Sequence, residues 1–200
     1  MAAVLLALAA GEAAAQAQVG VPGCPDDVAV QAWREPITFD SRGRSIRAHL
    51  YTPRGQGNGA GIVLLHGGTG FEMNSILFDA HAIQLASRGY HVILPAYFDA
   101  AAPDGRRRTV TARAWRQVAL DAAEALAAEP GLARERVALW GYSRGAGVAA
   151  DAATSPGSGV RSAILVAGGG SVDEDVTGRE LSVLMLDARR DEAVPVGRTP

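Results

Sequence analysis

VALWGYSRGAGVAA, residues 137–150, joins an apolar run to a stretch of small residues through Ser143, which lies between two glycines. The apolar run predicts a buried strand, and the small residues predict a helix that packs closely on a sheet. Glycines two residues before and two after a serine leave room for a sharp strand-to-helix turn with a strained serine backbone. Such a turn exposes the hydroxyl at the carboxyl edge of the sheet, where the first helix amides favour negative charge. We interpret Ser143 as a candidate nucleophile; a serine that only forms a turn is the alternative.

Further strands are predicted on both sides of this segment. Each is an unbroken apolar run of the kind that is buried on both faces of a parallel sheet. The runs are IVLL (62–65), YHVILPAYF (90–98), RSAILVAGGG (161–170) and LSVLMLD (181–187).

Two helices and a hairpin complete the pattern. One helix is predicted with Asn74 or Ser75 as its cap and its end near Gly89, and a second over 111–128, after a loop at 101–110. Upstream, residues 37–39 and 45–51 form strands around the turn DSRG. The order predicts an α/β fold: a mostly parallel sheet with helices on both faces and an N-terminal antiparallel hairpin.

The loop HGGTG, residues 66–70, follows the first buried strand and resembles a loop that supplies half of an oxyanion hole. Acyl transfer builds charge on a carbonyl oxygen, so preorganised amide donors lower its barrier. The predicted donors are the amides of Gly68 and Arg144, with Thr69 as the alternative to Gly68. We expect His66, at a strand end, to brace this loop by hydrogen bonding.

A candidate acid follows the last predicted strand in LSVLMLDARRDEAVP, residues 181–195. A carboxylate placed after a late strand can orient a histidine and stabilise it once it is protonated. Asp191 has the better position, four residues past the strand end, and Asp187 is the second choice. A solvated turn carboxylate is the alternative reading of both.

Composition limits the class of protein. The chain has 200 residues with 48% hydrophobic and 20% charged residues, which is typical of one globular domain. A net charge of −2 gives no argument for binding nucleic acid, and no apolar stretch of about 20 residues predicts a membrane span. The single cysteine, Cys24, excludes an internal disulfide and a cysteine-based zinc site. No metal is predicted.

The N-terminus resembles a secretory signal peptide. Its short apolar core is followed by small residues with an Ala-x-Ala match at 15–17, although no Lys or Arg precedes the core. We therefore divide the chain into a leader, 1–26, and one domain, 27–200. The expected location is secreted or periplasmic, with a disordered tail on a cytoplasmic protein as the alternative.

The chain resembles the α/β-hydrolase fold and, within it, the dienelactone hydrolase family and its esterase and peptidase relatives. The resemblance lies in the order of the hairpin, LLHGGTG, GYHVILPAYF, VALWGYSRGAG, ILVAGGG and LMLDARRDEAVP. The resemblance covers roughly residues 35–200. It implies a nucleophile, an acid and a histidine in that chain order, an eight-stranded sheet and no cofactor. Dienelactone hydrolases proper have cysteine at the position of Ser143 and an acidic residue at that of Gly67. Both differences favour a serine esterase over a lactone hydrolase.

The histidine that this resemblance implies does not follow Ser143 in the 200 residues. The chain's histidines are His49, His66, His81 and His91. Their predicted positions, in the hairpin, at a strand end, on a helix and at a strand start, do not place a base beside the serine. In such folds the histidine follows the acid by some tens of residues, after one further helix and strand. We therefore expect the sequence to be incomplete at its C-terminus, with the base, the last helix and the last strand beyond residue 200.

The sequence thus predicts a serine hydrolase that cleaves an ester or related acyl bond through an acyl-enzyme on Ser143. The expected partner is a small-molecule acyl substrate; neither nucleic acid nor a stable membrane span is expected, and the oligomeric state is unknown. A peptidase or an acyltransferase on the same fold is the alternative within catalysis. A non-catalytic binding protein that keeps the fold is the alternative outside it.

Overall fold

The computed structural model describes residues 28–103, 108–168, 176–188 and 190. The predicted leader, 1–26, and Asp191 lie outside the described residues.

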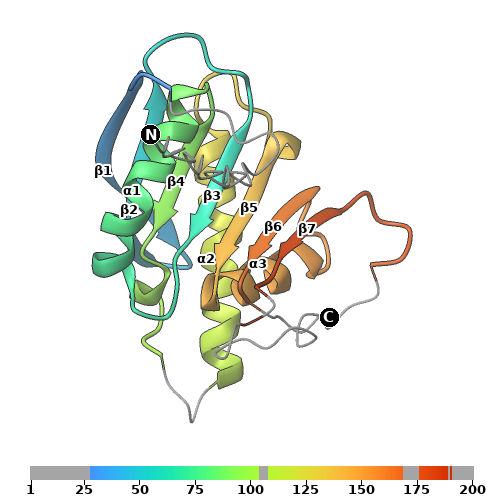
Figure 1. Cartoon of the computed structure of the whole chain (residues 1–200). Coiled ribbons are helices and arrows are strands. Elements are labelled where there is room, and N and C mark those ends of the chain that lie inside the picture. The colour runs from blue at the N-terminus through green and yellow to red at the C-terminus, as the bar shows by residue number, and fades with distance from the viewer. Residues whose placement is uncertain (1–27, 104–107, 169–175, 189, 191–200) are drawn as a thin grey trace, which may run out of the picture.

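One twisted sheet organises the molecule (Figure 1). Its seven described strands are β1 (Ala32–Ser41), β2 (Arg44–Pro53), β3 (Gly61–Leu65), β4 (His91–Pro95), β5 (Val137–Tyr142), β6 (Ser162–Val166) and β7 (Ser182–Leu186). They lie in the order β1-β2-β4-β3-β5-β6-β7. β1 and β2 form an antiparallel hairpin, β2 pairs antiparallel with β4, and all other pairs are parallel. The predicted fold class is confirmed.

Helices cover both faces of the sheet. They are α1 (Phe71–Ser87), α2 (Arg108–Ala127) and α3 (Arg144–Thr154), with short 3₁₀ turns η1 (Tyr97–Asp99) and η2 (Arg134–Arg136). Alternate side chains of one strand serve the two faces: Ile62 and Leu64 pack with α1, whereas Val63 and Leu65 pack with α2 and α3. This two-sided burial explains why the parallel strands are continuous apolar runs.

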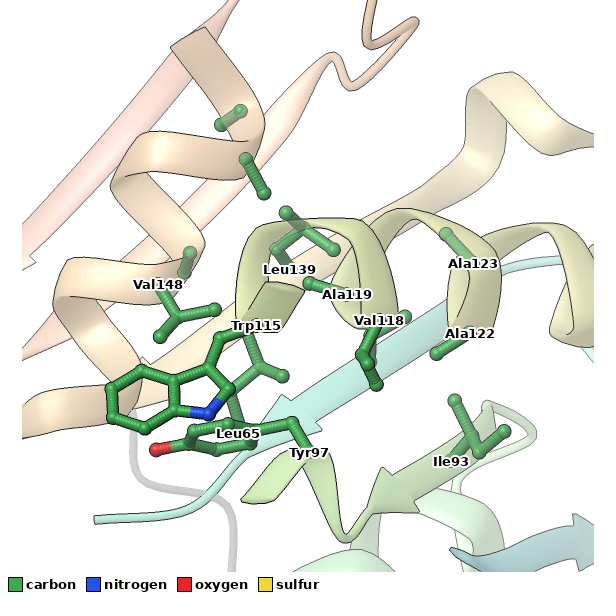
Figure 2. Packing of buried hydrophobic residues seen from close by; sticks show 14 of the residues in the cluster. Leu65, Ile93, Tyr97, Trp115, Val118, Ala119, Ala122, Ala123, Leu139 and Val148 are labelled. Atoms are coloured by element: carbon green, nitrogen blue, oxygen red, sulfur yellow. The ribbon is translucent and has the colours of Figure 1, made fainter. Parts of the chain in front are cut away.

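The larger core lies between the sheet, α2 and α3 (Figure 2). The predicted apolar face of the second helix is buried there, with Trp115, Val118, Ala122 and Leu126 all almost without exposed surface. The Trp115 ring lies edge-on to Tyr97, their centroids 5.5 Å apart. These contacts hold the segment after β4 against the start of α2.

The structure corrects several predicted boundaries. The hairpin strands, predicted over 37–39 and 45–51, extend over Ala32–Ser41 and Arg44–Pro53. α1 begins at Phe71 rather than with Asn74 or Ser75 as its cap, directly after Gly70, whose φ of 91° favours glycine. The run 90–98 is a strand only as far as Pro95, because the chain then turns into η1, where the Asp99 amide bonds the Ala96 carbonyl. α2 starts at Arg108, inside the predicted loop.

The β7 edge of the sheet is exposed. β7 pairs with β6 alone, and all five of its residues are exposed among the described residues. Leu184 is 53% exposed and Leu186 49%. In the register they align with Ile164 and Val166 of β6, which are half-buried. Within the described ranges, no helix is both long and apolar enough to cross a membrane.

Candidate active site

Ser143 lies at the sharp turn between β5 and α3. Its backbone has φ 52° and ψ −116°, a region that residues with a side chain rarely occupy. The Ser143 amide donates to the Val166 carbonyl at 2.8 Å, and its carbonyl accepts from Ala146 at 3.0 Å. The first bond fixes the turn to the end of β6, and the second joins it to the first turn of α3. The half-buried hydroxyl forms no hydrogen bond with any other described residue, so it is available to a ligand.

Three glycines make room for this turn. A Cβ atom on Gly141 would lie 2.1 Å from the Gly145 carbonyl oxygen, and one on Gly145 would lie 2.2 Å from that of Leu65. A Cβ atom on Gly168 would lie 2.2 Å from the Ser143 carbonyl oxygen. The glycines of the sequence pattern are therefore required by backbone packing, as their spacing predicted. Gly168, after β6, is a third such position that the pattern does not contain.

The structure brings the two predicted oxyanion donors to neighbouring segments. Because Gly145 abuts Leu65, the first turn of α3 packs directly on the end of β3 and the loop after it. The Arg144 guanidinium lies beside this loop, with Nε 3.2 Å from where a Cβ atom on Gly68 would be. Its Cζ lies 5.7 Å from the centre of the Trp115 ring. The Gly68 amide donates no hydrogen bond within the described residues. The Arg144 amide, at the first position of a helix, has no partner inside that helix.

Asn74 holds the same loop through side-chain hydrogen bonds, a role that the sequence analysis missed. Its side chain is 1% exposed. Nδ2 donates to Thr69 Oγ1 and to the Gly70 carbonyl oxygen, both at 2.6 Å, and Oδ1 accepts from the Gly67 amide at 3.4 Å. The only signal in the sequence is a polar residue shortly after a glycine-rich loop, a position that equally suits a helix cap.

His66 braces the loop through a side-chain hydrogen bond, as predicted. It is fully buried and stacks on Tyr97 with 4.1 Å between ring centres. Nδ1 lies 2.9 Å from the Gly67 carbonyl oxygen, which can only accept, so Nδ1 carries the proton of the neutral ring. Nε2 is buried without a partner among the described residues. Burial lowers the pKa of His66 to about 4, because the charged ring would lose its hydration.

The other histidines lie where the sequence placed them. His49 is on β2, His81 is on α1 against Phe78 and Trp140, and His91 starts β4 at the edge of the sheet opposite to Ser143. None of the chain's four histidines forms a hydrogen bond with Ser143. Within the described residues, Ser143 therefore has no hydrogen-bonded histidine base.

Of the two candidate acids, the described residues include Asp187. It is exposed and directly follows β7. Tyr142, Val166 and Leu186 share one register row, so Ser143 and Asp187 leave the same edge of the sheet two strands apart. Two strand spacings correspond to roughly 10 Å. A histidine ring that contacts both carboxylate and serine would fit between such positions. Within the described part of the chain, no cluster of His, Cys, Asp and Glu could hold a metal ion.

Comparison with known proteins identifies relatives of this arrangement. The model of the dienelactone hydrolase family matches residues 46–199. No match was found among curated proteins.

Three solved structures illustrate the likeness in fold. A dienelactone hydrolase-like promiscuous phosphotriesterase from metagenomic libraries is 19% identical, with a TM-score of 0.67 over 83% of this chain and 72% of its own. The dienelactone hydrolase from Anabaena variabilis is 18% identical, with a TM-score of 0.54 over 69% and 64%. The esterase from the archaeon Pyrobaculum calidifontis is 28% identical, with a TM-score of 0.54 over 68% and 44%.

Proposed function

Because this chain belongs to the dienelactone hydrolase family, we propose that it is a serine hydrolase that cleaves an ester or related acyl bond of a small molecule through an acyl-enzyme on Ser143. One observation carries the proposal. Ser143 combines a left-handed backbone, a hydroxyl without a partner among the described residues and neighbouring amides free to bind an oxyanion. A turn-forming serine would need none of these together. The strained strand-to-helix turn supports its assignment as a nucleophile elbow.

The proposed reaction has two halves. Ser143 Oγ forms a bond to the acyl carbon while a base takes its proton, and the carbonyl π electrons move to the oxygen. The amides of Gly68 and Arg144 donate to that oxyanion, and the α3 N-terminus adds a favourable dipole. When the intermediate collapses, the protonated base gives its proton to the departing alkoxide. Water then repeats the sequence on the acyl-enzyme and releases the acid and Ser143.

The base in this proposal is a histidine outside residues 1–200, and the acid that orients it is Asp191. The buried His66 does not suit the role, since its Nδ1 is engaged with Gly67 and its Nε2 lies among aromatic rings. Asp187 is the second candidate acid. Its place at the end of β7, two strands from Ser143, is compatible with reaching a histidine.

The experiment is a hydrolysis assay of the full-length natural protein with p-nitrophenyl acetate and butyrate. We expect Ser143→Ala to lower kcat by about 10⁴-fold or more, as loss of a catalytic nucleophile does. Asp191→Asn should lower kcat by about 10⁴-fold and Asp187→Asn by less than tenfold if Asp191 is the acid. The reverse ranking would assign Asp187. Equal rates for wild type and Ser143→Ala would contradict the proposal.

A further inference from the structure

The side chain of Asn74 hydrogen-bonds both neighbours of Gly68 but forms no hydrogen bond with Gly68 itself. It accepts from the Gly67 amide and donates to Thr69 Oγ1, and its third bond goes to the Gly70 carbonyl. Gly68 lies between these contacts, and its amide has no partner in the described chain, nor does that of Thr69. The buried Asn74 side chain thus holds the residues on both sides of the exposed Gly68 N–H.

The loop needs such support because its own backbone is permissive. Three of its five residues are glycines, and Gly70 has φ 91°. Among the described residues, only one backbone–backbone hydrogen bond closes the loop on itself, from the Gly70 amide to the Gly67 carbonyl at 3.3 Å. Opposite Asn74, the Tyr97 hydroxyl donates to the His66 carbonyl at 2.7 Å and fixes the first residue. Asn74 contacts three of the residues 67–70, and His66 contacts Gly67.

Helix capping does not account for these contacts. A capping side chain precedes its helix and accepts hydrogen bonds from first-turn amides. Asn74 is the fourth residue of α1, and its two short bonds are donated backwards, out of the helix into the loop. The Asn74 backbone amide already bonds the Gly70 carbonyl at 3.2 Å, so the helix start is satisfied without the side chain.

We propose that Asn74 is a positioning residue that fixes the direction of the Gly68 N–H toward the reacting carbonyl oxygen. The inference rests on the proposed function of Ser143. Since Asn74 acts through Gly68, its loss should slow the chemical step and leave ground-state binding nearly unchanged. Removal of a whole oxyanion donor costs about 10²–10³-fold in rate, so a misdirected donor should cost about 10–100-fold.

The test measures the reaction of Ser143 in the full-length protein with a biotin-tagged alkyl fluorophosphonate, and separates the maximal rate constant kinact from the half-saturating concentration KI. Asn74→Leu, similar in volume, removes all three hydrogen bonds. Asn74→Asp keeps an acceptor for the Gly67 amide but loses both donated bonds. We expect kinact to fall about 10–100-fold in both, with KI within about threefold. Ser75→Ala, one residue along the same helix and outside the loop contacts, should match wild type.

A second pair of variants protects the test against misfolding of the Asn74 variants. Thr69 is exposed, so Thr69→Val should fold; it keeps the loop backbone but loses the oxygen that Asn74 binds. We expect a smaller fall in kinact for Thr69→Val and recovery in Thr69→Ser. Unchanged kinact in folded Asn74→Leu, or in Thr69→Val where Asn74→Leu does not fold, would overturn the inference while leaving the serine hydrolase intact. A wild-type protein without label on Ser143 would overturn both.

Discussion

Gly145 lies so close to Leu65 that a Cβ atom on the glycine would be 2.2 Å from the leucine carbonyl oxygen. The same atom would lie 2.6 Å from the His66 carbonyl oxygen. Both obstacles are backbone, which cannot rotate away. The contact sets the distance between the helix after Ser143 and the loop that contains Gly68, so the two halves of the proposed oxyanion site depend on it.

The Gly145→Ala variant should therefore lose both stability and reactivity. Forcing a methyl group into this contact should lower the free energy of unfolding by about 1–3 kcal/mol or more. The measurement is urea unfolding followed by circular dichroism. Gly55→Ala is the control, since a Cβ atom there meets nothing within 4 Å. Equal stability of the two variants would show that the contact is looser than described.

Tyr97→Phe tests the hydrogen bond from Tyr97 to His66, the first residue of the loop. The buried Tyr97 hydroxyl donates to the His66 carbonyl at 2.7 Å. Its removal leaves that carbonyl without this donor, and we expect a loss of about 1–2 kcal/mol in unfolding free energy. Tyr142→Phe should stay within about 0.5 kcal/mol, because the exposed Tyr142 hydroxyl bonds no described residue. A Tyr97→Phe variant as stable as wild type would contradict the account of this contact.

His66 should make stability depend on pH. Its pKa falls from the usual 6.5 to about 4 on folding, so between these values the unfolded chain binds more protons than the folded one. The contribution of the neutral ring to the free energy of unfolding is therefore complete above pH 6.5, and it is lost as the pH falls toward 4. The loss amounts to about 3 kcal/mol.

The measurement for His66 is urea unfolding at pH 7.5 and at pH 5, in wild type and in His66→Asn. Burial also lowers the pKa of His49 and of His91, so the variant should retain part of the pH dependence. The difference between the two proteins isolates His66. Identical pH dependence in both would refute a buried neutral ring at this position.

The β7 edge should limit the solubility of residues 1–200 expressed alone. Leu184 and Leu186 are about half exposed on a strand that pairs on one side only in the described structure. We expect this piece to aggregate, and Leu184→Thr with Leu186→Thr to raise the soluble fraction measured by centrifugation. Ile76→Gln, at an exposed apolar position on α1, should change it little. A wild-type piece that stays monomeric in light scattering would contradict the expectation.

Local pattern was sufficient to predict the strands and the serine turn. β3 and β5 are unbroken apolar runs that end at glycine-containing turns, and backbone packing at Gly141 and Gly145 demands the spacing that suggested Ser143. The helix faces followed from the same periodicity. The predicted start of α1 was wrong because Gly70, which has no side chain, occupies the cap position, and the helix begins at the next residue.

The support of the site could not be predicted because it depends on contacts across the fold. Tyr97 bonds a carbonyl 31 residues away, and no local pattern marks that pairing. Asn74 resembles an ordinary cap residue until the loop folds back over it. Asp191 lies outside the described residues, and its choice over Asp187 stays a prediction.

The central claim is that Ser143 is an activated nucleophile, and the most direct measurement is the site of covalent modification. Full-length protein should be treated with a fluorophosphonate, digested and sequenced by mass spectrometry. We predict one phosphonylated residue, Ser143, with no modification in Ser143→Ala and none after heat denaturation, since the hydroxyl reacts only in the folded site. An unmodified Ser143 in the folded protein, or equal labelling of wild type and Ser143→Ala, would contradict the account.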